Sequence, residues 1–249
     1  MQSVDRAVSI LELLGRQEEA GVTEIAAELG VHKSTASRLA TSLELRGLIT
    51  QTEERGKYRL GLGLIRLAGA VRVRLDLSQQ SRPVCEELAA EIAETINLAV
   101  LDRDTVINID QVIGPSAITT HNWLGRRTPL HATSSGKVLL AHLPEPALDD
   151  RLAVPLERYT RHTVTDPGTL RTQLKQIRAD GFAFSVEELE TGLNAVAAPV
   201  LTLGGQVVAA LSASGPSFRF TERRLREVAA AVRAAAEEIS GRLGHSGQL

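Results

Sequence analysis

The sequence has little of three things: cysteine, long apolar runs and excess positive charge. Its single cysteine, Cys85, excludes a disulfide scaffold and any zinc or iron–sulfur site built from several cysteines. No apolar run approaches the roughly 18–20 residues that span a bilayer, and no charged-then-apolar signal segment opens the chain. We therefore expect a soluble cytoplasmic protein with no membrane partner.

Neither sign of charge dominates. The chain carries 28 Lys and Arg residues against 30 Asp and Glu residues, which gives a formal net charge of −2. This balance excludes a generally basic nucleic-acid coat protein but allows a local basic patch. With 249 residues, of which 43% are hydrophobic and 23% charged, the chain is long and apolar enough for one or two globular domains with a real core.

The first sixty residues predict three short helices followed by a β-hairpin. Apolar residues recur at helical spacing from Val4 to Leu14, and Thr23 is placed to cap a second helix that ends at Gly30. A third helix is predicted to start near Ser34, and two β-favouring runs around a glycine-containing polar turn predict a hairpin that ends near residue 60. This order indicates a winged helix-turn-helix, a DNA-binding fold, over residues 1–61.

Hydroxyl groups and cations gather on the outer face of the third predicted helix and at the hairpin tip. Such groups suit phosphate oxygens and major-groove base edges. The candidate DNA-binding residues are His32, Lys33, Ser34, Thr35, Ser37, Arg38, Thr41, Arg55 and Lys57. Between residues 32 and 59, six cations stand against three acids, a local charge of 6 − 3 = +3. The alternative is a three-helix protein-interaction module with a solvated charged face.

The remaining chain predicts a helical linker and a mixed domain. Residues 62–77 form the linker in this interpretation, and a second helix is expected to be capped near Ser78 or Ser81. Over residues 78–249, strands are predicted at 96–101, 106–112, 117–123, 182–185, 196–203 and 206–214, and helices at 134–142, 169–179 and 221–243. Hairpin strands with helices packed on them indicate an α+β fold, not a doubly wound parallel sheet.

Enzyme motifs are weak in this second domain. Ser134-Ser135-Gly136-Lys137 matches the S-x-x-K pattern of β-lactamase-like acylases, but neither S-D-N nor K-T-G accompanies it. The stretch also fails the phosphate-loop pattern, because His131 and Val138 stand where Gly and Ser or Thr are needed. The six histidines show no metal-binding spacing. We expect no catalysis, no cofactor and no metal; the alternative is an enzyme or metabolite-binding protein with an accessory winged helix.

Over essentially its whole length, the chain resembles the IclR family of bacterial transcriptional regulators. The resemblance rests on ordered blocks: SVDRAVSILELL (3–14), TEIAAELGVHKSTASRLATSLELRGLI (23–49), YRLGLGLIRLA (58–68), GRRTPLHATSSGKVLLAHLP (125–144), RADGFAFSVEELETGLNAVAAPV (178–200) and VVAALSASGP (207–216). It implies a winged helix that binds double-stranded operator DNA, a linker helix that dimerises, and a GAF-like domain that binds a small effector. It also implies a dimer or dimer of dimers that represses a catabolic operon.

The linker carries its own indication of self-association. Its apolar residues Leu64, Leu67, Ala68 and Val71 form a stripe at helical spacing, and the small first domain offers this stripe no obvious partner. We therefore expect the stripe to pack on another subunit, so that two reading heads bind two half-sites.

The resemblance also selects effector-binding residues by position, and two further residues are expected in the pocket wall. Together they are Thr120, Trp123, Ser134, Ser135, Ser185, Leu193, Ala195, Ser212 and Ser214. Ser134 and Ser135 stand at a predicted helix start, where free N–H groups and the helix dipole favour an anion. Ser212 and Ser214 are two apart on one strand and so face the same way. The cluster predicts a small organic acid, bound through its carboxylate.

The chain departs from one known pattern of the family. A glyoxylate- and pyruvate-responsive member has Asp at the position of Ser185 and Cys at the position of Ala195. Because that acid and that thiol are both missing, the resemblance does not carry over the same ligand. We expect a different and larger organic acid, or an aromatic acid.

Overall fold

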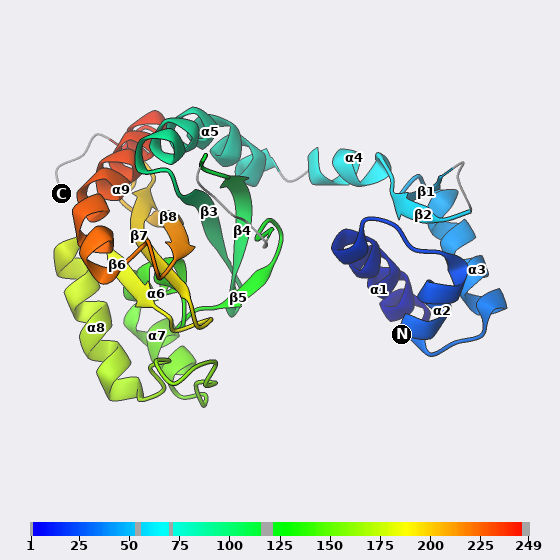
Figure 1. Cartoon of the computed structure of the whole chain (residues 1–249), viewed down its shortest axis with the longest axis horizontal. Helices are drawn as coiled ribbons and strands as arrows, with labels where there is room; N and C mark the ends of the chain where they lie inside the picture. The colour runs from blue at the N-terminus through cyan, green and yellow to red at the C-terminus, as the bar shows by residue number, and fades with distance from the viewer. Residues whose placement is uncertain (1, 53–55, 70–71, 116–121, 246–249) are drawn as a thin grey trace. The chain divides into compact units, whose positions relative to one another are not determined.

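The computed structural model describes residues 2–52, 56–69, 72–115 and 122–245 and divides the chain into two compact units, Met1–Leu75 and Asp76–Leu249 (Figure 1). Within those described ranges, no helix combines the length and the hydropathy needed to cross a membrane.

The N-terminal unit is a winged helix-turn-helix. Its elements are α1 (Gln2–Gln17), α2 (Val22–Leu29), α3 (Lys33–Glu44), β1 (Ile49–Gln51), β2 (Tyr58–Leu60) and α4 (Gly63–Gly69), with β1 and β2 paired antiparallel. The first three helices bury their apolar faces in one core, which includes Ile10, Leu14, Ile25 and Leu43. On α3 the buried residues Ala36 and Ala40 are small, which lets this helix pack closely against its neighbours.

Two backbone features fix the geometry of this unit. Gly30 ends α2 with a φ of 60°, the left-handed conformation that glycine adopts without strain, and so turns the chain into α3. The backbone of Ala20 exchanges two hydrogen bonds with Tyr58, at 3.0 and 2.9 Å, which fixes the hairpin to the loop before α2. The hairpin is therefore held as a wing beside the helices.

Two helix starts differ from the prediction. Thr23 lies inside α2 and is not its cap; the N-cap is Gly21, whose N–H donates to the Glu24 carboxylate at 2.7 Å. The α3 helix starts at Lys33 with His32 as N-cap, one residue earlier than Ser34. Neither N-cap accepts a hydrogen bond through its own side chain. The preference for a hydroxyl cap therefore misplaced the start of α2, whereas the start of α3 lies within one residue of the predicted position.

The C-terminal unit is an antiparallel sheet between two layers of helices. Its strands are β3 (Thr95–Asp102), β4 (Thr105–Val112), β5 (Arg127–Pro129), β6 (Ala183–Val186), β7 (Leu193–Leu201) and β8 (Val207–Pro216), in the order β5-β4-β3-β8-β7-β6. Its helices are α5 (Arg72–Ile92), α6 (Ser134–Ala141), α7 (Glu145–Leu152), α8 (Pro167–Asp180) and α9 (Glu222–Arg242). The predicted α+β class is confirmed, and the hairpin pairing of β3 with β4 is antiparallel as expected.

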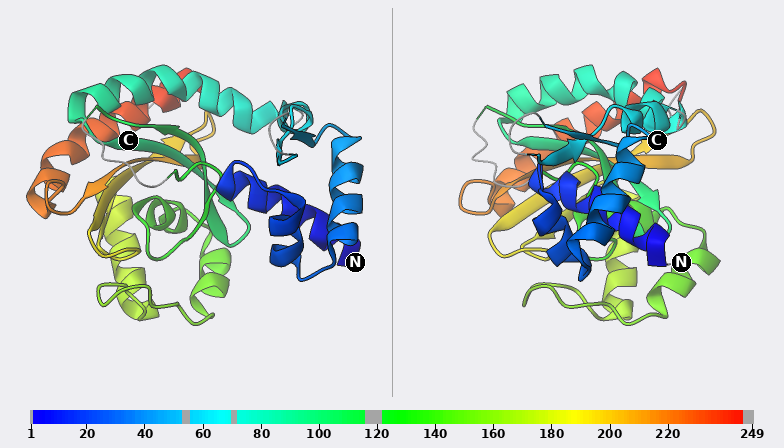
Figure 2. Two further views of the ribbon diagram at one scale, coloured as in Figure 1. Left: turned by 45° about the vertical axis from the view of Figure 1, so that its right-hand side comes forward. Right: turned by 90° about the vertical axis from the view of Figure 1, so that its right-hand side faces the viewer.

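The helices divide between the two faces of the sheet (Figure 2). One core lies under α5 and α9, and it takes Ile96, Leu98 and Val100 from β3. The other lies under α6, α7 and α8, and it takes Ala99 from the same strand. Because successive strand residues point to opposite faces, the α6 face of β3 carries Asn97 and Ala99.

Several predicted elements of this unit need correction. The helix expected to begin at a cap near Ser78 or Ser81 is a single helix, α5, that begins at Arg72. Neither serine caps it: the Ser81 hydroxyl donates to the Leu77 carbonyl at 2.7 Å, and the Ser78 hydroxyl donates to Asp110 at 3.0 Å. The strand predicted at 117–123 falls mostly outside the described residues. Strand β5 and helix α7 were not predicted.

Candidate functional site

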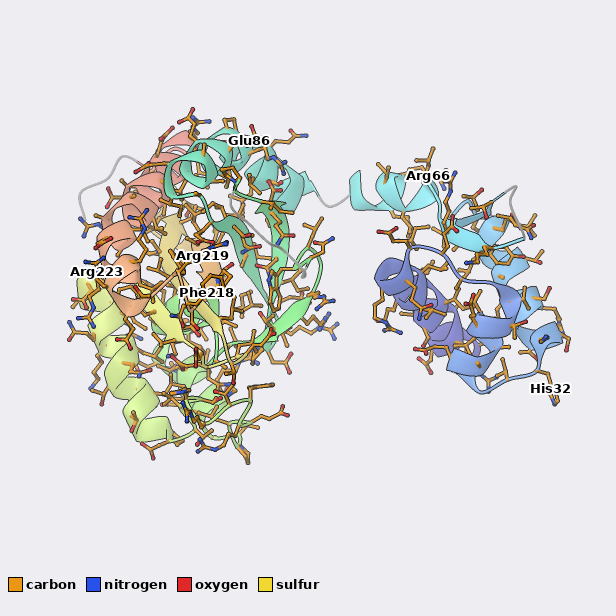
Figure 3. The ribbon with its side chains drawn as sticks, viewed as in Figure 1. His32, Arg66, Glu86, Phe218, Arg219 and Arg223 are labelled. Carbon is orange, nitrogen blue, oxygen red and sulfur yellow. The ribbon has the colours of Figure 1, made fainter. Side chains whose placement is uncertain are left out.

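The first candidate site is the outer face of α3. His32, Lys33, Ser34, Arg38 and Thr41 are exposed there. Figure 3 shows the His32 side chain at the start of α3, directed away from the helical core. The face is exposed because the buried residues of the helix fall on its opposite side, where they enter the core.

The remaining predicted DNA-binding residues are less open. Thr35, Ser37 and Lys57 are half-buried, and Arg55 lies outside the described residues. Within the described part of the chain, Lys33, Arg38 and Lys57 form no ion pair, whereas Arg16 on α1 binds Glu28 at 2.6 Å. Cations without an acidic partner are available to phosphate oxygens.

The second candidate site is a pocket on the α6 face of the C-terminal sheet. It encloses about 500 Å³ of empty space, including its open mouth. The lining residues are Asn97, Val106, Asn108, Trp123, Thr128, Thr133, Ser134, Ser135, Ser185, Leu189, Leu193, Ala195, Ser212 and Ser214. Of the nine residues selected from the sequence, eight line this one pocket; the ninth, Thr120, lies outside the described residues.

Strand register brings the sheet residues of the pocket together. Ser214 on β8 stands opposite Ala195 on β7, and Ala195 stands opposite Ser185 on β6. One row along, Ser212 on β8 stands opposite Asn97 on β3. Three consecutive strands, β6, β7 and β8, and the distant strand β3 thus contribute neighbouring side chains to one floor.

The start of α6 forms another wall of the pocket. Thr133 caps this helix: its hydroxyl oxygen accepts the Gly136 N–H at 3.1 Å and its hydroxyl donates to the Pro129 carbonyl at 2.9 Å. The backbone N–H groups of Ser134 and Ser135 have no acceptor among the described residues. They are therefore free to bind an anion, which the helix dipole also favours at this end.

The close approach of α6 to the preceding segment depends on glycine. A Cβ on Gly136 would overlap the backbone of Leu130, so only glycine lets the first turn of the helix lie against this segment. The glycine thereby fixes the position of the N–H groups at the wall of the pocket.

The pocket hydroxyl groups differ in how far they are already engaged. The Ser185 hydroxyl donates to the Ala132 carbonyl at 3.0 Å, so it fixes the segment before α6 to the sheet and is not free to donate to a ligand. The Ser214 oxygen accepts from the Asn97 amide at 3.3 Å, which leaves the Ser214 proton available. The Ser212 hydroxyl makes only a long contact of 3.5 Å to the backbone carbonyl oxygen of Asn97.

Among the described residues that line the pocket, none carries a charge. The nearby Lys137, the lysine of the S-x-x-K stretch, is only 2% exposed and its ammonium binds the Glu188 carboxylate at 2.5 Å. Burial lowers the pKa of Lys137. The amine is thus held by a carboxylate.

Six lining residues were missed from the sequence. Val106, Asn108, Thr128, Thr133, Leu189 and Asn97 complete the list. Asn97 had a detectable signal, because it is a lone amide within the otherwise mostly apolar strand Ile96–Leu101 and shares the two-residue period of Ala99. The others come together only through the pairing of β3, β4 and β5 and through the β6–β7 loop.

Comparisons with known proteins cover both units. The IclR helix-turn-helix domain matches residues 3–53, and the bacterial transcriptional regulator IclR C-terminal domain matches residues 69–241. The HTH-type transcriptional regulator KdgR of Escherichia coli (strain K12) is 35% identical over 246 residues, which cover 98% of this chain and 94% of KdgR. The HTH-type transcriptional repressor AllR of Klebsiella pneumoniae is 34% identical over 245 residues, with 98% and 90% covered.

A solved structure extends the likeness to the fold. An IclR homolog from Microbacterium hydrocarbonoxydans, complexed with 4-hydroxybenzoate, matches with a TM-score of 0.83 at 30% identity, over 97% of this chain and 99% of that one. The relatives are named as transcriptional regulators, and both the DNA-binding and the effector domain are matched. The chain therefore belongs to the IclR family of bacterial transcriptional regulators.

Proposed function

We propose that this regulator binds operator DNA through α3 and the wing, and that a small organic acid in the pocket of the C-terminal unit changes its affinity for that DNA. The observation that carries the proposal is the meeting of Ser134, Ser135, Ser212 and Ser214 around one pocket at the start of α6. The transcriptional repressor AllR is among the relatives, which supports a repressor role. In this proposal the regulator represses a catabolic operon and the acid relieves that repression.

The character of the pocket supports a carboxylate ligand of moderate size. Two free N–H groups at the start of α6 suit a single carboxylate, whereas Trp123, Leu189 and Leu193 offer apolar surface to the rest of the molecule. A related structure holds 4-hydroxybenzoate, a small aromatic acid. An aromatic acid, or an aliphatic acid of similar size, is the effector class proposed here.

The linker supplies the proposed dimer contact. Leu67 on α4 is 55% exposed, and Leu62 and Ile65 beside it are exposed as well. Of the other members of the predicted stripe, Leu64 is half-buried, the side-chain environment of Ala68 is not described, and Val71 lies outside the described residues. Apolar side chains in such numbers on one short helix favour burial against a second copy, and pairing gives the two reading heads that two half-sites require.

The effector response is tested with the double variant Ser212→Ala, Ser214→Ala. Operator binding is measured by fluorescence anisotropy on the DNA beside the gene, with carboxylates in matched pairs: benzoate and 4-hydroxybenzoate, butanoate and 4-hydroxybutanoate, propanoate and 3-hydroxypropanoate. At least one acid should change the operator affinity of the wild-type protein by about 5- to 150-fold, the usual range of allosteric coupling. The double variant should bind the operator normally and lose the response.

A matched control removes a hydroxyl elsewhere in the same unit. Thr172 on α8 is exposed, and its hydroxyl donates to the Gly168 carbonyl at 3.1 Å, so Thr172→Ala should respond as the wild type does. A double variant that still responds at the wild-type concentration places the effector outside this pocket. If no acid of the panel acts on the wild-type protein, the organic-acid class is wrong.

A further inference from the structure

Asn97 is a buried polar side chain with an unsatisfied atom. It lies in the middle of β3 and is only 4% exposed, between Ile96 and Leu98, which are fully buried. Its amide nitrogen donates to Ser214 at 3.3 Å, but its side-chain oxygen Oδ1 is buried and has no hydrogen-bond partner within the described chain. Buried polar atoms are nearly always paired, so an exception calls for an explanation.

The position of Asn97 supplies the explanation. Its side chain lines the effector pocket, opposite Ser212 in the strand register. If Asn97 only held Ser214 in place, it would use one proton of its side-chain amide. The burial of its side-chain oxygen Oδ1 without a partner would then have no explanation. A buried, unpaired acceptor on a residue that lines a ligand pocket is explained if a donor on the ligand completes it.

We propose that Asn97 selects the effector by accepting a hydrogen bond from a hydroxyl group, so that the ligand class is a hydroxy acid and not a plain carboxylic acid. This inference rests on the proposed function, because it concerns the ligand of the same pocket. The two polar regions of the pocket are complementary to such a molecule. The start of α6 presents donors, the N–H groups of Ser134 and Ser135, whereas Asn97 presents an acceptor.

Hydrogen-bond chemistry makes this arrangement selective. A site built to bind a substrate hydroxyl rejects the analogue that lacks it, because the buried acceptor is then left without a partner and without water. The described residues that line the pocket include no charged side chain that could pair with Oδ1 of Asn97 in place of the ligand. Loss of the ligand hydroxyl is expected to weaken binding by about 10-fold or more.

The first arm of the test uses the full chain without ligand and separates a binding role from a structural one. Asn97→Leu keeps the approximate size of the side chain and removes the unpaired acceptor Oδ1. Its matched control is Asn194→Leu: Asn194 is also buried, but its amide donates to the Phe220 carbonyl at 2.9 Å and its oxygen accepts the Glu187 N–H at 3.1 Å. The midpoint of thermal unfolding should stay the same or rise in Asn97→Leu and should fall in Asn194→Leu. A matching fall in both variants overturns the proposal.

The second arm measures binding of the paired carboxylates by calorimetry. In the wild-type protein the hydroxylated member of a pair should bind about 10-fold or more tightly than its partner, and in Asn97→Leu the two should bind equally. 4-Methoxybenzoate, which accepts but does not donate, should bind no more tightly than benzoate. Tighter binding of the methoxy acid than of 4-hydroxybenzoate means that the amide presents its N–H group to the pocket and overturns the hydroxy-acid assignment.

The outcomes distinguish this inference from the proposed function. Acids that bind the wild-type protein and change its DNA affinity, with no preference for the hydroxyl, overturn the role of Asn97 and leave the organic-acid regulator intact. A hydroxyl preference that persists in Asn97→Leu also overturns it. Absence of binding by every acid of the panel overturns the proposed function and this inference together.

Discussion

The ion pair between Lys137 and Glu188 links the two sides of the effector pocket. Lys137 follows the two serines at the start of α6, and Glu188 lies in the β6–β7 loop beside Leu189, which lines the pocket. The side chains are 2% and 9% exposed, and the ammonium nitrogen is 2.5 Å from the carboxylate oxygen Oε1. The second carboxylate oxygen, Oε2, is buried and has no partner in the described chain.

We expect this ion pair as a whole to contribute little to the free energy of unfolding, whereas removal of one partner alone should be costly. At an effective dielectric constant of about 20, two unit charges at this separation attract by about 6 kcal/mol. Removing each ion from water costs several kcal/mol, so the attraction and the desolvation nearly cancel. Removal of one partner leaves the other charge buried alone. Lys137→Met or Glu188→Met should therefore lower the free energy of unfolding by about 3–5 kcal/mol, and the double variant should lie within about 1 kcal/mol of wild type.

Urea unfolding of the four proteins measures these differences. The chain has one tryptophan, Trp123, which lies in the C-terminal unit, so its fluorescence reports on the unit that holds the pair. Single variants that each lose less than about 1 kcal/mol would show that water reaches the pair. A double variant as unstable as the sum of the singles would refute the reasoning, because the two charges would then not compensate each other.

The same pair gives a pH dependence with a definite sign. Because burial lowers the pKa of Lys137, the folded chain binds fewer protons at this site than the unfolded chain does. The contribution of Lys137 to stability therefore rises with pH between its folded pKa and its unfolded value of about 10.4. The free energy of unfolding of the wild-type protein relative to the double variant should increase with pH over this window; a decrease would contradict the burial of a charged amine.

Three further predictions concern the DNA face, the linker and the core. Arg38→Ala should weaken binding to the operator by about 10- to 100-fold, whereas Arg16→Ala, which removes a cation already paired within its unit, should not. Lys57→Ala should weaken binding to specific and random DNA alike, and it should reduce the slope of log affinity against log salt concentration by about one. Unchanged affinity in both the Arg38 and the Lys57 variant would refute the assignment of this surface to DNA binding. Leu67→Glu should yield monomers in light scattering, and a persistent dimer would count against the linker contact. Burial raises the pKa of Cys85 to about 12, so iodoacetamide at pH 8 should label it only after unfolding; fast labelling of the folded chain would show an open thiol.

Local patterns predicted most elements because their causes lie within a few residues. The turn at Gly30 and the hairpin of β3 and β4 follow from a required backbone conformation and a short polar turn, and both stand as predicted. The prediction of where α5 begins was wrong because Ser81 lies inside the helix and donates its hydroxyl to the carbonyl of Leu77. In sequence, a serine used in this way cannot be distinguished from a helix cap. Helix α7 had a signal in Leu148 and Leu152, four residues apart and both buried, which was overlooked.

The composition of the pocket was harder to predict because it depends on register. Ser185 and Ser214 are brought together by the pairing of β6, β7 and β8, and neither segment alone shows which residue faces its neighbour. The family resemblance provided that placement for seven of the lining residues. It did not provide Asn97: the lone amide in an apolar strand pointed to a pocket position, but the unpaired atom was found only when its hydrogen bonds were traced in the structure.

The pairing of Lys137 also bears on how the pocket works as a sensor. An ammonium group directed at the effector would bind a carboxylate strongly. A site that is saturated at every effector concentration in the cell cannot report changes in that concentration. Glu188 instead holds that ammonium, and the lining residues are left with backbone N–H groups, hydroxyls and amides as polar contacts. Neutral donors of this kind contribute less each than a desolvated cation does, so selectivity must come from the number and direction of hydrogen bonds. Under the proposed function, a pocket built in this way would discriminate by the shape and hydroxylation of the acid and not by its charge, which the many metabolites of a cell share.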